Sequence, residues 1–249
     1  MTQLKKQQFV CIDCETTGLD PKQDRVIEVA AVRFTMDEVL EECEFLVDPE
    51  CLIPETSIAI HHITQEMVTG KPTISAVLPA VLDLIGKDII VGHGVGFDIE
   101  MIAAAADRAG IPCLLRNNRY LDTLRMARLY GESPTNSLEQ LRRHFNIAAE
   151  GAHRAMSDVI VNVDVFKFLM MRYKSVDQLF DVLSRPIAMK IMPLGKHKGR
   201  LLKEIPVEYL QWAANKDFDQ DLLFSIRSEI KRRKKGNLFS QAANPFGDL

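Results

Sequence analysis

The sequence lacks the long apolar run that a membrane-spanning helix requires. No stretch of its 249 residues approaches the roughly 20 consecutive apolar residues that cross a bilayer. The polar start, residues 1–8, has no apolar region of the kind found in signal peptides. With 47% hydrophobic and 26% charged residues, the composition is typical of a globular protein. We therefore expect a cytoplasmic protein that has no membrane partner.

Cysteine is also scarce, and its pattern excludes a disulfide scaffold. The chain has five cysteines, an odd number at irregular spacing. Cys11 and Cys14 have the C-x-x-C spacing of many zinc sites. On a strand, however, residues three positions apart point to opposite faces, so the two thiols cannot bind one ion. We expect both to be small buried hydrophobic residues.

Positive charge is sparse in most of the chain and concentrated near its end. Residues 1–185 hold 19 Lys and Arg against 27 Asp and Glu, whereas residues 186–249 hold 12 against 7. A basic appendage on an acidic body is expected to attract a polyanion, although a solvated basic helix explains the charge equally well. With Arg185-Pro186 as a boundary, we predict a domain over 1–185, a basic module over 186–235 and a flexible tail over 236–249.

The hydrophobic pattern predicts an α/β fold with a mixed sheet. Runs at 9–12, 25–34 and 41–47 indicate an antiparallel meander. Shorter strands at 88–93 and 120–123 then alternate with helices, expected at 75–85, 99–109, 124–129, 138–145, 156–173 and 176–183. We expect helices on both faces of this sheet, and a small, mainly helical C-terminal module with helices at 208–214 and 221–235.

The stretch Phe9-Val-Cys-Ile-Asp-Cys-Glu-Thr-Thr-Gly18 organises the site that we predict. Side chains alternate along a strand, so Asp13 and Glu15 project to the same side. Two neighbouring carboxylates repel each other and are costly to bury unless a cation lies between them. Carboxylate oxygens suit Mg²⁺ or Mn²⁺. The alternative is a strand that ends in a solvated acidic turn.

Three later segments bring further chemistry to the ends of core elements. Asp98 follows a buried strand, Asp122 ends another, and His153 precedes Asp158 by five positions. Taken singly, Asp98 and Asp122 are explained as acids at helix N-termini. His153 and Asp158 can converge only if the histidine lies in the loop before the helix that carries the aspartate. Together they have the composition of a two-metal phosphodiesterase site.

These motifs resemble those of a known superfamily. Asp13-x-Glu15-Thr-Thr-Gly18, Phe97-Asp98 and His153-x₄-Asp158 resemble the three exonuclease motifs of the DEDDh 3′–5′ exonucleases, which include the proofreading epsilon subunit of bacterial DNA polymerase III. The resemblance covers about residues 8–173 and implies a ribonuclease-H-like mixed five-stranded sheet. Two positions depart from the family pattern: His62 stands where the H-G-I-T segment has glycine, and Gly94 stands where the second motif often has asparagine.

The resemblance also implies roles for single residues. Asp13, Glu15 and Asp158 would bind two Mg²⁺ or Mn²⁺ ions, with Asp98 serving the second ion directly or through water. His153 would be the general base. The expected substrate contacts are the backbone at Thr16 with the terminal 3′-OH, Leu19 and Phe97 with the last base, and His62 near the nucleotide.

Residues 192–233 resemble a small module, with an M-P-[FL]-G-K-x-K-G start, that is often found after such exonuclease domains. Lys196, Lys198 and Arg200 surround two glycines and are candidate nucleic-acid contacts, because glycines let backbone amides approach phosphates. Tyr209 and Trp212 are expected in the core of this module rather than as stacking platforms.

We therefore predict a metal-dependent 3′–5′ exonuclease that releases nucleoside 5′-monophosphates from single-stranded 3′ ends of DNA, in proofreading or repair. The alternatives are an RNA-trimming 3′–5′ exoribonuclease on the same fold and a non-catalytic polymerase accessory protein. A replicative polymerase or a sliding clamp is the expected protein partner. Lys235-Gly-Asn-Leu-Phe239 resembles a clamp-binding peptide only faintly, since it lacks the leading glutamine.

Overall fold

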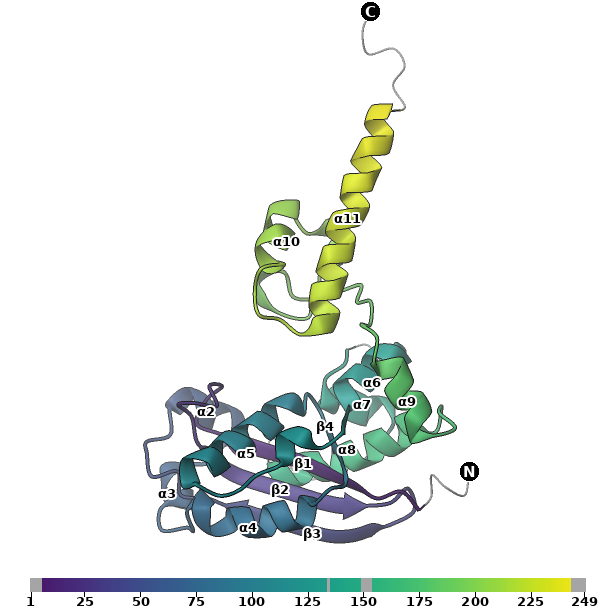
Figure 1. Cartoon of the computed structure of the whole chain (residues 1–249). Helices are drawn as coiled ribbons and strands as arrows, with labels where there is room; N and C mark the ends of the chain where they lie inside the picture. Colours follow the sequence, from purple (N-terminus) through teal and green to yellow (C-terminus); the bar gives the residue numbers. More distant parts are fainter. Residues whose placement is uncertain (1–5, 134, 149–153, 243–249) are drawn as a thin grey trace, which may run out of the picture. The chain divides into compact units, whose positions relative to one another are not determined.

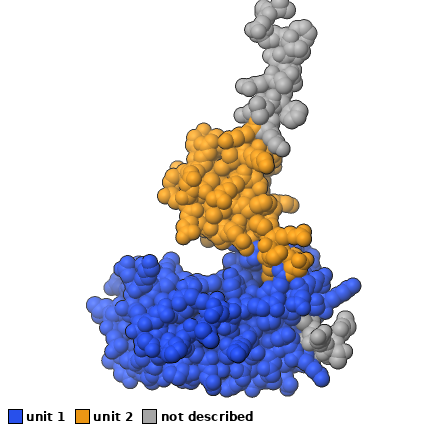
Figure 2. Space-filling view, viewed as in Figure 1, with its two compact units in different colours: residues 1–180 blue, residues 181–249 orange. Residues whose placement is uncertain are grey.

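The computed structural model describes residues 6–133, 135–148 and 154–242. The chain divides into two compact units, residues 1–180 and 181–249, which Figure 2 shows in different colours. This division falls within helix α9 (Val176–Leu183), a few residues before the predicted boundary at Arg185. Each unit has its own apolar core, so each is described by itself.

The first unit is built on a five-stranded mixed sheet of order β3-β2-β1-β4-β5. Strands β1, β2 and β3 form the predicted antiparallel meander, and β4 and β5 continue the sheet parallel to β1. The bounds are β1 Phe9–Thr16, β2 Val26–Phe34, β3 Val39–Leu46, β4 Ile89–Gly92 and β5 Tyr120–Asp122. The predicted sheet is therefore confirmed, although β1 runs four residues past its predicted end at Ile12 because Asp13 to Thr16 continue the pairing with β2.

Helices cover both faces of the sheet (Figure 1). Helix α8 (Ala155–Met170) packs on β1 and β2 from one side, where Phe166 meets Phe9 and Phe34 with ring centroids 4.9 and 5.8 Å away. On the other side lie α4 (Ile74–Ile85) and α5 (Gly96–Ala109). Their buried faces pack with Val10, Ile12 and Val29. Strands β1 and β2 are buried at nearly every position because helices cover both of their faces.

The remaining helices of this unit are α2 Glu55–His61, α3 Gln65–Val68, η1 Leu115–Asn117, α6 Thr123–Tyr130 and α7 Leu138–His144. Helices α6 and α7 lie within a residue of their predicted ranges, whereas α2, α3 and η1 lie outside the predicted helices. Ser137 is the N-cap of α7 and accepts a hydrogen bond from the backbone of Gln140. Pro79 lies inside α4, beyond its first turn.

The second unit packs α10 (Val207–Ala213) against α11 (Gln220–Ala242), with the short turns η2 (Gly195–His197) and η3 (Leu202–Glu204) before them. Its core contains Met192, Leu210 and Leu222. Two expectations are corrected here. Trp212 is not a core residue, because 51% of its surface is exposed. Helix α11 does not end at Lys235, because Gly236 is accommodated within it at a cost of about 1 kcal/mol.

No helix in the described ranges is both long enough and apolar enough to cross a membrane.

Candidate active site

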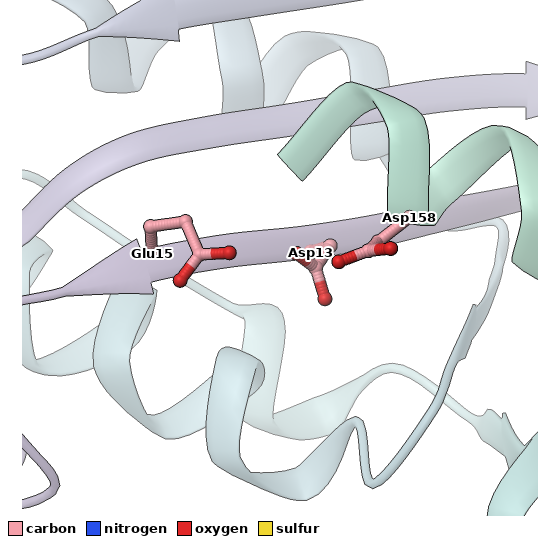
Figure 3. A group of neighbouring side chains, drawn as sticks. All are labelled: Asp13, Glu15 and Asp158. Carbon is pink, nitrogen blue, oxygen red and sulfur yellow. The ribbon is translucent and has the colours of Figure 1, made fainter. Parts of the chain in front are cut away.

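Strand β1 places Asp13 and Glu15 on one face of the sheet, toward the start of α8 (Figure 3). Asp13 pairs with Ala30 and Glu15 pairs with Glu28 on the neighbouring strand β2. Asp158, in the first turn of α8, completes a group in which one carboxylate oxygen from each of the three residues lies within 4.8 Å of the others. The structure thus brings Asp158 next to two acids, Asp13 and Glu15, from which it is far removed in the sequence.

Burial and the crowding of carboxylates raise the pKa values of these acids. Burial, followed by the charges of Asp98 and Glu15, raises the pKa of Asp13 well above its ordinary value. Burial and the charge of Asp158 raise the pKa of Glu15 to about 7. The ionised group of acids is therefore costly in the protein alone, and a bound cation would relieve that cost.

Asp98 lies beside this group at the edge that β4 leaves open. Strand β1 pairs with β4 only from Phe9 to Cys11, so the backbone N–H of Cys14 has no strand partner on that side. The Asp98 carboxylate accepts this N–H at 3.0 Å and the Cys14 thiol at 3.2 Å. Asp98 is 5% exposed, and burial raises its pKa to about 7. The cysteine between the two acids of β1 therefore has a defined contact, in addition to being buried as predicted.

An ion pair between the buried Glu28 and the partly exposed Arg154 attaches the start of α8 to the sheet. Glu28, 0% exposed in the middle of β2, accepts hydrogen bonds from Arg154 Nε at 3.0 Å and from an Arg154 terminal nitrogen at 2.6 Å. Its second oxygen accepts the backbone N–H of Ala155 at 2.8 Å. Arg154 is the N-cap residue of α8 but gives no side-chain cap, so Glu28 supplies that function from another strand. The sequence analysis missed Glu28.

A second contact fixes α8 one turn after Asp158. Asn162, 3% exposed, accepts a hydrogen bond from the hydroxyl of Thr123 at 2.6 Å. The Thr123 hydroxyl also lies 3.1 Å from the Gly92 carbonyl and from His93 Nδ1. Burial lowers the pKa of His93 to about 4, so this imidazole is neutral at pH 7. Asp158 therefore lies on a helix that is attached to the sheet on both sides of it.

We expect Glu28→Ala to lower the free energy of unfolding by about 3 kcal/mol, because it leaves Arg154 and the Ala155 N–H without their shared partner. Turnover should also fall in the fraction that stays folded, since α8 carries Asp158. Chemical denaturation and single-turnover kinetics measure the two effects. Glu42→Ala is the matched control, because Glu42 is an exposed acid on β3; it should change stability by less than about 0.5 kcal/mol. Equal effects of the two substitutions would contradict this role of Glu28.

The Thr16-Thr17-Gly18 turn is held by a short loop that returns along it. Thr17 exchanges backbone and side-chain hydrogen bonds with Arg25, and its hydroxyl donates to Asp24 at 3.1 Å. A Cβ added at Gly18 would lie 2.5 Å from the Asp24 carboxylate, so a larger residue there would force the Asp24 side chain to move. Thr16 is 9% exposed, and its hydroxyl donates to the Gly18 carbonyl. The backbone next to Glu15 is thus rigidly placed.

The two histidines at the end of α2 differ in their surroundings. His61 is 2% exposed; its Nδ1 accepts the Ile63 N–H at 3.0 Å, while its Nε2 has no hydrogen-bond partner among the residues the structure describes. Burial lowers the pKa of His61. His62 is exposed and ends α2 with a φ of 61°. The usual glycine at this position is explained by that left-handed backbone, which glycine adopts without strain.

We expect His62→Gly to be more stable than His62→Ala by about 1 kcal/mol, because only alanine keeps the Cβ that strains a left-handed residue. Thermal denaturation of the two variants measures the difference. The DNA affinities of the two variants test whether His62 contacts the nucleotide. If it does, both variants bind DNA more weakly than the parent chain. Equal melting temperatures would contradict the prediction, because they would show that the Cβ of alanine causes no strain at position 62.

The other predicted site residues have the following places. Leu19 follows the turn and is 84% exposed, and Phe97 is half-buried in the first turn of α5. Asp122 is the N-cap of α6, accepting the N–H of Leu124 at 2.9 Å, as the sequence suggested. Gly94 has a φ of 77°, which suits glycine better than asparagine. The predicted base, His153, lies outside the described residues, directly before Arg154.

The three basic candidates, Lys196, Lys198 and Arg200, lie in the second unit and are exposed. The acid cluster lies in the first unit, and the structure does not place the two units relative to each other. The basic candidates are therefore considered separately below.

Comparison with known proteins agrees with this geometry. A family model described as "Exonuclease", of the RNase T type, matches residues 10–166, and a second, described as "Putative quorum-sensing-regulated virulence factor", matches residues 181–230. The epsilon subunit of DNA polymerase III from Aquifex aeolicus is 34% identical over 163 residues, which cover 64% of this chain and 78% of that protein. The PolC-type DNA polymerase III of Clostridium perfringens is 32% identical over 176 residues, or 70% of this chain.

The chain spans only 12% of the length of that PolC-type relative. Among solved structures, a single-stranded DNA complex of Escherichia coli exonuclease I is similar with a TM-score of 0.63 and 25% identity, covering 72% of this chain and 43% of that one. Exonuclease X in complex with 5′ overhanging duplex DNA has a TM-score of 0.55 and 25% identity, covering 70% and 98%. These similarities confirm the ribonuclease-H-like exonuclease fold that the motifs implied.

The acid cluster at the end of β1 thus lies within the region that matches the family model, and the second match begins where the first unit ends. The chain belongs to the RNase T-type exonuclease family of DEDDh enzymes, is related to the epsilon subunit and to the PolC exonuclease domains, and carries a C-terminal module of a second family.

Proposed function

We propose that the protein is a metal-dependent 3′–5′ exonuclease that removes nucleoside 5′-monophosphates one at a time from the 3′ end of DNA. The observation that carries the proposal is the cluster of Asp13, Glu15 and Asp158, with ligand oxygens within 4.8 Å of one another, in a chain of an exonuclease family. Membership in a family with polymerase relatives supports a role in proofreading or repair.

The donor set suits two Mg²⁺ or Mn²⁺ ions, because it consists of carboxylate oxygens, and burial together with neighbouring acids raises the pKa values of Asp13 and Glu15. Asp13, Glu15 and Asp158 would hold the ions, and Asp98 would take part directly or through water. When bound, such ions polarise the scissile phosphate and lower the pKa of the attacking water.

The chain itself would position the terminal nucleotide. The Thr16 backbone lies next to Glu15 and is fixed by the turn, so it is a candidate partner of the 3′-OH. His61, the last residue of α2, has a buried Nε2 with no hydrogen-bond partner among the described residues, and Leu19 and Phe97 offer apolar contact for the last base. His153 would accept the proton of the water, which requires a neutral imidazole.

The test uses a 5′-labelled single-stranded DNA with Mg²⁺. We expect a ladder that shortens from the 3′ end, and a uniformly labelled strand of the same sequence should release a product that co-migrates with nucleoside 5′-monophosphates. A 3′-terminal phosphorothioate should slow the first cut, and chelation by EDTA should stop the reaction. Cleavage at internal positions, or activity that EDTA leaves unchanged, would contradict the proposal. An RNA of the same sequence, run in parallel, tests the alternative of an exoribonuclease.

A replicative polymerase or a sliding clamp stays a predicted partner, supported by similarity to a polymerase subunit and to a polymerase that contains such a domain. The cytoplasmic location is likewise a prediction from the sequence. Retention of the full chain on immobilised sliding clamp would support a clamp partner, and its loss on deletion of residues 235–239 would identify the contact.

A further inference from the structure

The C-terminal module exposes the chain's only tryptophan. Trp212 lies on α10, and 51% of its surface is accessible, whereas its neighbours Leu210 and Ala213 are fully buried. A large apolar ring that is half exposed costs free energy that burial would recover. The position of Trp212 on the outer face of α10 therefore needs an explanation other than the packing of the module.

A row of aromatic contacts connects Trp212 to the basic turn of the module. The Tyr209 ring lies 5.2 Å from the Trp212 ring, and the His197 ring meets Tyr209 edge-on at 4.4 Å. Gly195, with a φ of 72°, lies so close to Tyr209 that a Cβ would be 3.0 Å from the phenolic oxygen. The turn that carries Lys196 and Lys198 is thus pressed against the ring next to Trp212.

The basic residues around this row are not neutralised by acids. In the part of the chain that the structure describes, no carboxylate forms an ion pair with Lys196, Lys198, Arg200 or Lys216. In contrast, Arg232 and Arg233 on α11 both bind Glu229, at 2.8 and 2.7 Å. Lys216 Nζ lies 4.9 Å from the centre of the Trp212 ring. The acids nearest to Trp212 in the sequence are Glu208, one helical turn before it, and Asp217.

We propose that this surface, formed by Trp212, Lys216 and the Lys196–Arg200 turn, binds single-stranded DNA. A base would stack on the exposed indole, and Lys216, which already lies over the ring, would move to an adjacent phosphate. The unpaired charges of the turn would bind the next phosphates, assisted by backbone amides around Gly195 and Gly199, where both glycines have positive φ.

The chemistry favours a single strand over other polyanions. A duplex hides the faces of its bases, so it offers phosphates but nothing that stacks on an indole. An acidic peptide would satisfy the lysines but has no flat ring for Trp212. The surface belongs to the second unit and needs no catalysis, so it extends the proposed function without depending on the acid cluster.

The sole tryptophan makes the contact directly measurable. The full chain carrying Asp13→Asn, which prevents degradation, is titrated with oligo(dT) while tryptophan emission is followed. We expect saturable quenching, and none from a duplex of the same length or from an abasic strand. Failure of oligo(dT) to quench at concentrations that saturate binding would overturn the proposal. Poly-glutamate that quenches as strongly as oligo(dT) would also overturn the proposal. Quenching by oligo(U) but not by oligo(dT) would overturn it as well.

Variants of the full chain provide the second readout. Trp212→Ala should weaken binding of oligo(dT) about 5- to 150-fold, whereas Trp212→Phe should keep most of the affinity. Lys198→Ala should reduce the slope of log K against log salt by about 0.7. Arg232→Ala, which removes an arginine that is paired with Glu229, is the matched control and should leave binding unchanged. Unchanged affinity in correctly folded Trp212→Ala would overturn the proposal whether or not the nuclease is active.

Discussion

Replacing Asp13 with asparagine is expected to reduce exonuclease turnover by about 10³-fold or more. Asp13 lies between Glu15 and Asp158 in the acid cluster, and loss of its charge removes several kcal/mol of cation-dependent stabilisation of the transition state. Single-turnover cleavage of a labelled DNA measures the effect. Glu66→Gln, which neutralises an exposed acid of α3, should leave the rate unchanged. An Asp13→Asn protein with normal turnover would contradict the assignment of the site.

The same substitution should raise stability in EDTA. The pKa of Asp13 is raised, and those of Glu15 and Asp98 are about 7, so the folded protein binds these protons more tightly than the unfolded chain does. Stability in EDTA should therefore fall as pH rises from about 4 to about 7, and stay low above that range. Melting temperatures should decline less steeply in Asp13→Asn. If the parent protein became more stable between about pH 4 and about pH 7, the raised pKa values of these acids would be contradicted.

Replacing His153 with alanine should cost about 10²–10⁴-fold in rate, the range typical of a general base. An imidazole must be neutral to accept a proton, and its unperturbed pKa is about 6.5. The rate of the parent enzyme should rise with pH between about 6 and 8, and His153→Ala should flatten that rise. Affinity for DNA, measured in Ca²⁺, should change little because all four acids remain.

The control for this variant is His144→Ala, which removes an exposed imidazole that contacts Tyr130. It should keep both the rate and the pH profile of the parent. If His153 only supports the start of α8, its replacement would lower the melting temperature while the folded protein kept normal turnover. That result would remove His153 from the proposed mechanism.

The sequence predicted the sheet and the acid pair because both follow from short-range alternation. The period of two in β1 is sufficient to place Asp13 and Glu15 on one face. It is not sufficient to place Asp98, whose position depends on where the pairing of β1 with β4 stops, a tertiary feature. Only the resemblance to a family connected Asp98 with the pair.

Glu28 shows what a closer reading of the sequence could have found. It is the one charged residue inside the apolar run Val26–Val32, and a charge buried on a central strand needs a partner. Arg154 cannot be identified as that partner from the sequence, because 126 residues separate the two. Trp212 was wrongly placed for a different reason: apolar spacing on a helix as short as α10 does not determine which face the rest of the module covers.

The attachment of α8 to the sheet has a consequence for how cations bind. Since Glu28 and Asn162 hold the helix on both sides of Asp158 through contacts within the chain, the ligand set is preorganised, and binding need not be coupled to the ordering of a segment. What opposes cation binding is instead the displacement of protons from the carboxyls of Glu15 and Asp98, whose pKa values are about 7. For each proton released, apparent cation affinity would change about tenfold per pH unit. The fold thus makes cation affinity depend on acidity rather than on flexibility.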